Sequence, residues 1–167
     1  MAELFPKDII DAASRVIQAA EQRNLRIATT ETVTAGLLSA ALTSVSGASS
    51  VFERGYVFYH ASAKATGLGV DPAIAAEHCA VSAEVTAALA SALGDHSEAD
   101  LGIAITGYAG PTGGNKRDPV GTVYLAAFRR GKQTQVERRV FSGDRTEVKL
   151  QAVSEALRIL EGELISA

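Results

Sequence analysis

Apolar residues recur along several segments of the chain at the spacing of an amphipathic helix. After Pro6, which suits the first turn of a helix, such positions are Ile9, Ile10, Ala13, Val16, Ile17 and Ala20. Four further helices are predicted: residues 36–45, a short stretch opening at Asp71-Pro72, residues 82–94, and residues 146–164. Ser82 and Asp144 are suited to cap the last two.

Short β-prone runs between these helices predict strands at residues 25–29, 56–59, 101–106, 120–129 and 133–141, while residues 64–69 are ambiguous. Arg130-Gly131-Lys132 separates the last two strands as in a hairpin. Helices interleaved with strands favour a sheet covered on both faces, and a closing hairpin makes that sheet mixed. The expected fold is therefore α/β, a three-layer αβα sandwich with about five central strands, and residues 1–167 are expected to form a single domain.

Composition narrows the function classes. Lys and Arg total 16 against 19 Asp and Glu, so the chain lacks the basic footprint of a nucleic-acid-binding protein. Its one cysteine, Cys79, cannot form an internal disulfide, and His60, His78 and His96 lack metal-ligand spacing. We expect no metal, no cofactor and no membrane association. Because residues 1–6 lack a signal-peptide pattern, we expect a cytoplasmic protein.

A polar turn at residues 29–36 is the first candidate site, because it joins a predicted strand to a predicted helix. Thr30, Thr32 and Thr34 would place hydroxyls beside the free N–H groups of the helix start. Such a turn can bind an anion, or can hold a hydroxyl nucleophile next to an oxyanion hole. The alternative is structural: one Thr caps the helix and the others are turn residues.

A second candidate is the glycine-rich loop that follows the strand at residues 101–106. Its four glycines, Gly107, Gly110, Gly113 and Gly114, would let the backbone approach a ligand closely. It matches neither the Walker A pattern nor the dinucleotide fingerprint. A flexible turn between two strands is the alternative.

Tyr59, Lys64 and Arg145 are further candidates. A Lys near a hydroxyl acts as a base if desolvation lowers its pKa, and an Arg at a helix start suits a phosphate. The alternatives are a surface Lys and an ordinary helix start at Asp144-Arg145.

Several stretches together resemble the CinA carboxy-terminal domain family. They are residues 52–59 with Lys64, residues 80–82, residues 106–123 and residues 141–145. Characterised members of this family are nicotinamide mononucleotide deamidases, which release ammonia and leave nicotinate mononucleotide. The resemblance also covers the polar turn: Glu31, Thr34, Gly36, Tyr59 and Lys64 keep the family residue.

Four positions depart from the family pattern. The nucleophilic Ser of the family corresponds to Thr32, its Cys to Val33, its first Gly to Ala35, and its usual Asn to Ala61. The resemblance implies Thr32 as nucleophile with Tyr59 and Lys64 moving the proton, and N–H groups at the helix start holding the oxyanion. It implies substrate-binding residues at Glu31, Thr34, Gly36, Thr106, Gly107, Gly110, Gly113, Gly114 and Arg145.

Three functions stay open on the sequence alone. The first is an amidohydrolase of a pyridine nucleotide. The second is a relative without turnover that still binds such a nucleotide, because the nucleophile turn is altered. The third is an interaction domain whose main property is self-association. In each case we expect a homo-oligomer.

Overall fold

The computed structural model describes residues 4–166. The amino-terminal stretch without a signal-peptide pattern therefore lies partly outside the described residues. Five strands form one sheet in the order β2-β1-β3-β4-β5. They are β1 (Ile27–Glu31), β2 (Phe52–Val57), β3 (Leu101–Gly107), β4 (Thr122–Arg129) and β5 (Gln135–Val140).

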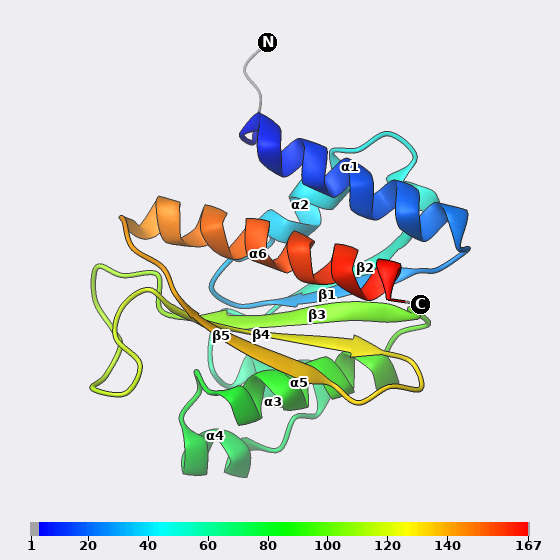
Figure 1. Ribbon diagram of the computed structural model, residues 1–167. Helices are drawn as coiled ribbons and strands as arrows, with labels where there is room; N and C mark the ends of the chain where they lie inside the picture. The colour runs from blue at the N-terminus through cyan, green and yellow to red at the C-terminus, as the bar shows by residue number, and fades with distance from the viewer. Residues whose placement is uncertain (1–3, 167) are drawn as a thin grey trace.

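The sheet is mixed. β1 pairs in parallel with both β2 and β3, whereas β3–β4 and β4–β5 are antiparallel. The helices are α1 (Lys7–Gln22), α2 (Leu37–Thr43), α3 (Ala63–Leu68), α4 (Pro72–His78), α5 (Ala83–Asp95) and α6 (Arg145–Ile165), with a short 3₁₀ turn at Ala48–Ser50. In Figure 1, α1, α2 and α6 cover one face of the sheet, and α3, α4 and α5 lie on the other. The predicted three-layer α/β fold is confirmed.

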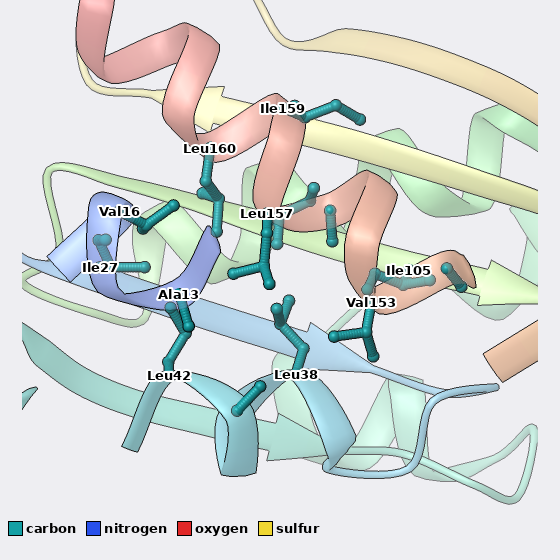
Figure 2. Packing of buried hydrophobic residues seen from close by; sticks show 14 of the residues in the cluster. Ala13, Val16, Ile27, Leu38, Leu42, Ile105, Val153, Leu157, Ile159 and Leu160 are labelled. Carbon is teal, nitrogen blue, oxygen red and sulfur yellow. The ribbon is translucent and has the colours of Figure 1, made fainter. Parts of the chain in front are cut away.

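Two apolar clusters hold the layers together. Figure 2 shows the larger one, in which Leu157 and Leu160 of α6 lie over the sheet beside Leu38 and Leu42 of α2. The smaller cluster packs Leu89 and Leu93 of α5, among others, against the opposite face. No helix among residues 4–166 is both long and apolar enough to cross a bilayer.

Most predicted element boundaries are correct, and the caps explain why. Ser82 accepts a hydrogen bond from the Val85 N–H, and Asp144 accepts one from the Glu147 N–H. Asp71 caps α4 through the Ala73 N–H. The ambiguous residues 64–69 belong mostly to α3.

Two predicted strands are displaced. The strand predicted at residues 56–59 starts four residues too late: β2 begins at Phe52 and ends at Val57. As an edge strand, β2 pairs only with β1 and is partly exposed, so it does not need a continuous apolar sequence. The first strand ends at Glu31, two residues beyond its predicted end, so the polar turn begins only at Thr32.

Candidate functional site

The candidate site lies where parallel strands β1, β2 and β3 end, the edge at which ligands bind in open α/β sheets. The loop after β3 and the first turn of α6 meet at this same end (Figure 1). A pocket of about 230 Å³ opens there. Its lining residues are Thr32, Val33, Tyr59, Ala61, Lys64, Ala80, Val81, Gly107, Tyr108, Ala109, Gly110, Thr112 and Arg145.

Thr32 follows β1 directly and is fixed by β3. Both its N–H and its hydroxyl donate to the Ile105 carbonyl, at 3.1 and 3.0 Å. Only 9% of the residue is exposed, yet it lines the pocket. The N–H of the next residue, Val33, has no acceptor among the described residues. A hydroxyl and an N–H without an acceptor therefore belong to two consecutive residues that line the pocket.

Glu31 closes the N-terminus of α2. Its Oε2 accepts from the Thr34 hydroxyl and the Gly36 and Leu38 N–H groups, at 2.7, 3.0 and 3.0 Å. Its Oε1 accepts from the N–H and the hydroxyl of Ser39, at 2.8 and 2.6 Å.

The expectation that these N–H groups face a ligand is therefore wrong for Gly36, Leu38 and Ser39, because a carboxylate of the chain itself occupies them. The structural alternative, a Thr cap, is also wrong, since Thr34 donates to Glu31 instead.

Lys64 brings an amine to the pocket from α3. The residue is 8% exposed, and its Nζ donates to the Ala80 carbonyl at 3.1 Å. Within residues 4–166 no carboxylate forms an ion pair with it. Burial lowers the pKa of the Lys64 amine below its ordinary value, because the charged form loses solvation without gaining a counter-ion.

A buried hydroxyl network holds the start of α5, just after the carbonyl that Lys64 uses. Ala80 precedes Ser82, the N-cap of α5, and the Thr86 hydroxyl donates to the Ser82 carbonyl at 2.6 Å. The same hydroxyl pairs with the Thr106 hydroxyl of β3 at 2.8 Å. Thr106 is thus fully buried beneath the site and ties α5 to the sheet, rather than lining the pocket.

Arg145 connects three segments at the pocket mouth. Its Nη1 donates to the Gly110 carbonyl at 2.7 Å, and its Nη2 donates to the Tyr59 hydroxyl at 2.6 Å. Tyr59 is 67% exposed. The loops after β2 and β3 are therefore joined by one guanidinium from the start of α6.

The glycine-rich loop divides into two parts. Gly107 and Gly110 line the pocket, whereas Gly113 and Gly114 do not. A Cβ on Gly107 would lie 2.8 Å from the Thr122 carbonyl oxygen, so close packing of β3 against β4 accounts for this glycine without a ligand.

The far part of the loop is held by the buried Asp118. Its Oδ1 accepts from the Tyr124 hydroxyl at 2.8 Å and from Arg138 at 3.0 Å. Asp118 fixes the far part of the loop and Arg145 holds the Gly110 carbonyl in the near part, so the loop is more than a flexible turn.

The structure thus brings together half of the predicted site residues. The pocket is lined by Thr32, Tyr59, Lys64, Gly107, Gly110 and Arg145. It is not lined by Glu31, Thr34, Gly36, Thr106, Gly113 or Gly114. Two positions that depart from the family pattern, Val33 and Ala61, also line it, and the resemblance had marked both. Ala80, Val81, Tyr108, Ala109 and Thr112 lie within or beside recognised motifs, but no property of their own singled them out.

The fourth position that departs from the family pattern is Ala35. Its φ is +51°, in the left-handed region that favours glycine. The turn keeps a conformation suited to glycine although a Cβ is present.

Comparison with known sequences supports one family. The sequence model of the CinA C-terminal domain matches residues 10–164, which is almost the whole chain. The chain belongs to the CinA C-terminal domain family. Among CinA relatives, the CinA-like protein of Myxococcus xanthus is 39% identical over 165 residues, covering 99% of this chain and 39% of that protein. The chain spans about two fifths of the length of several such relatives.

Other relatives of the CinA C-terminal domain have the length of this chain. The nicotinamide-nucleotide amidohydrolase PncC of Escherichia coli K12 is 37% identical over 153 residues, covering 92% of this chain and 93% of that protein. The crystal structure of the competence/damage inducible protein CihA from Agrobacterium tumefaciens superposes with a TM-score of 0.93 and 36% identity. It covers 96% of this chain and 98% of that one.

Proposed function

We propose that this protein is an amidohydrolase of the nicotinamide-nucleotide type, which converts nicotinamide mononucleotide to nicotinate mononucleotide and ammonia. One observation carries the proposal: the Thr32 hydroxyl and the buried Lys64 amine line one pocket whose basic side chains are Lys64 and Arg145 and whose lining includes no carboxylate. The name of the Escherichia coli relative, which matches over nearly its full length, supports the same substrate.

In this reaction the Thr32 oxygen attacks the carboxamide carbon, and its proton passes to Lys64. The N–H of Val33 donates to the oxyanion that forms. Collapse of the tetrahedral intermediate breaks the C–N bond, and ammonia leaves with the proton from Lys64. Water then hydrolyses the ester on Thr32 and regenerates the hydroxyl.

The Thr32 hydroxyl must give up a hydrogen bond before it reacts. It donates to the Ile105 carbonyl, so its O–H bond must turn away from that carbonyl before the proton can pass to Lys64. The methyl group of Thr restricts χ1 and so limits how far the oxygen can be repositioned. This contact favours the second candidate function, a relative that binds a pyridine nucleotide without turnover.

An ammonia-coupled assay with nicotinamide mononucleotide separates the two candidates. We expect release by the natural protein, faster release by Thr32→Ser, and none above blank by Thr32→Val, which keeps the shape but removes the hydroxyl. Lys64→Met should lose about a hundredfold or more of the rate. No release by the natural protein at high concentration, together with a thermal shift on adding the nucleotide, would instead establish the binding-only relative.

The pH dependence tests the role of Lys64. Only the neutral amine accepts a proton, so the rate should rise with pH, with a midpoint below the ordinary lysine pKa of about 10.4. A rise in rate with a midpoint at or above that value, or a rise that remains in Lys64→Met, would contradict the role of Lys64 as the base.

The stability of the protein gives a readout that needs no turnover. Between the lowered folded-state pKa and about 10.4, the unfolded chain holds more protons at Lys64 than the folded one. The free energy of unfolding should therefore rise with pH in this window, relative to Lys64→Met. Parallel curves for the two proteins would show that the Lys64 pKa is not lowered.

A further inference from the structure

Arg145 lines two neighbouring pockets. One is the site pocket, and the other, of about 400 Å³, lies against the start of α6 and shares Ala109, Gly110 and Arg145 with it. Arg145 donates to Gly110, which lines both pockets, and to Tyr59, which lines the site pocket. The side chain therefore lies where a ligand in either pocket would meet it.

The charge of Arg145 is not neutralised within residues 4–166. No ion pair there includes it, and both of its acceptors, a carbonyl and a phenol hydroxyl, are neutral. Arg15, Arg26, Arg54, Arg117, Arg138, Arg139 and Arg158, in contrast, each form an ion pair with a carboxylate. Arg23, Arg129 and Arg130 also donate to carbonyls without an ion pair, but none of these three lines either pocket. A guanidinium held only by neutral groups beside two pockets is suited to an anion.

The acidic residues indicate the side from which an anion approaches. The larger pocket includes Asp144, whose carboxylate would repel it. The site pocket includes Lys64 and no carboxylate. The anionic end of a ligand therefore meets Arg145 from the site pocket, on the side of Tyr59.

An anion that approaches from the site pocket competes with Tyr59 for Nη2 of Arg145. Nη2 donates one N–H to the Tyr59 hydroxyl and Nη1 donates one to the Gly110 carbonyl, so two of the five N–H donors of the guanidinium are taken. A phosphate that takes a two-point contact with Arg on the side of Tyr59 meets the N–H that Tyr59 holds. The Gly110 carbonyl belongs to an anchored loop, whereas Tyr59 is 67% exposed.

We infer that the phosphate of a bound ligand displaces the Tyr59 hydroxyl from Arg145, so that occupation of the anion subsite releases Tyr59. This inference rests on the proposed function for the identity of the ligand, a phosphate monoester, and adds the coupling between its phosphate and Tyr59. A substrate that carries the phosphate thereby frees a site hydroxyl that a nucleoside without phosphate leaves bound.

The test is binding of inorganic phosphate at constant ionic strength, followed by backbone amide signals in NMR. If Tyr59 competes with phosphate, Tyr59→Phe removes the competitor and keeps the ring. We expect phosphate to bind roughly three- to tenfold more tightly to Tyr59→Phe than to the natural protein, as for the loss of one ordinary hydrogen bond at an exposed position. Arg145→Gln should lose most of the binding.

Two matched variants serve as controls. Tyr56→Phe removes a hydroxyl whose acceptor is His96, and Arg26→Gln removes a cation paired with Glu98 beyond the opposite end of β1. Neither should change phosphate affinity. Unchanged or weaker binding by Tyr59→Phe would overturn the inference, as would unchanged binding by Arg145→Gln.

A second titration separates this inference from the proposed function. Tyr59→Phe should bind nicotinamide mononucleotide more tightly but should bind its nucleoside, which lacks the phosphate, with unchanged affinity. These readouts need no turnover. Tighter phosphate binding without ammonia release would uphold the coupling and reject the enzyme, whereas ammonia release without tighter binding would do the reverse.

Discussion

Two helices begin beside the candidate site, and their first turns are closed in different ways. At α6 the cap is local: Asp144 accepts from the Glu147 N–H at 2.9 Å, and the Glu147 carboxylate accepts from the Asp144 N–H at 2.7 Å. At α2 the cap comes from the preceding strand, because Glu31 reaches over the turn and takes N–H groups of Gly36, Leu38 and Ser39. One cap is exposed and adjacent in sequence, and the other is completely buried.

The two caps limit where an anion can bind. A free helix N-terminus attracts anions through its N–H groups and its dipole. Here both starts already hold a carboxylate of the chain, so under the proposed function recognition of a phosphate falls to side chains, above all Arg145. The buried cap also fixes the turn that carries Thr32, which the exposed cap does not touch.

Loss of the buried cap should have the largest effect. Glu31→Ala leaves three backbone donors and two hydroxyls without their acceptor. Because each buried unsatisfied donor costs about 1–3 kcal/mol and the hydroxyls can reorient, we expect a loss of about 3–5 kcal/mol in the free energy of unfolding. Denaturant titration measures it.

Glu31→Gln distinguishes the hydrogen bonds from the volume of the side chain. It preserves the shape but turns an NH₂ group toward backbone donors, so it should also be strongly destabilising. If both variants lose less than about 1 kcal/mol in the free energy of unfolding, the buried cap stabilises the protein no more than the exposed cap does.

Loss of the exposed cap should cost less. Asp144→Ala removes one acceptor at a solvated helix start, and we expect a loss of about 1 kcal/mol with an unchanged denaturant slope. Asp144→Asn keeps an N-cap acceptor and should recover most of that loss. If Asp144→Ala cost as much as Glu31→Ala, burial would not be the source of the difference.

The same contrast explains what could be predicted from the sequence. The caps at Ser82 and Asp144 are local, because the side chain and the N–H it binds are three residues apart, so the starts of α5 and α6 were predicted correctly. The apolar strands β3 and β4 were recognisable from their own residues for the same reason. The bounds of the edge strand β2 were predicted wrongly, because its exposed polar residues carry no strand pattern.

The contacts that organise the site are long-range and leave no local pattern. Tyr59 and Arg145 meet across 86 positions, and Thr86 and Thr106 across 20. The motif resemblance placed Thr32, Lys64 and Arg145 in one site. Only the folded structure shows that Thr106 joins α5 to the sheet. Glu31 was predicted to bind substrate, and its geometry instead makes it the cap of α2.

The smallest expected effect concerns Ala35, in the turn that the buried cap holds. At φ +51° an alanine costs about 1–2 kcal/mol relative to its preferred conformations. Glycine removes that strain but adds about 0.5–1 kcal/mol of unfolded-state entropy, so Ala35→Gly should stabilise the protein by about 0.5 kcal/mol. Ala19→Gly, within α1, is the matched control and should destabilise by about 1 kcal/mol. Equal losses in the two variants would mean that the turn relaxes in solution, and that Glu31 does not hold residue 35 in the left-handed region.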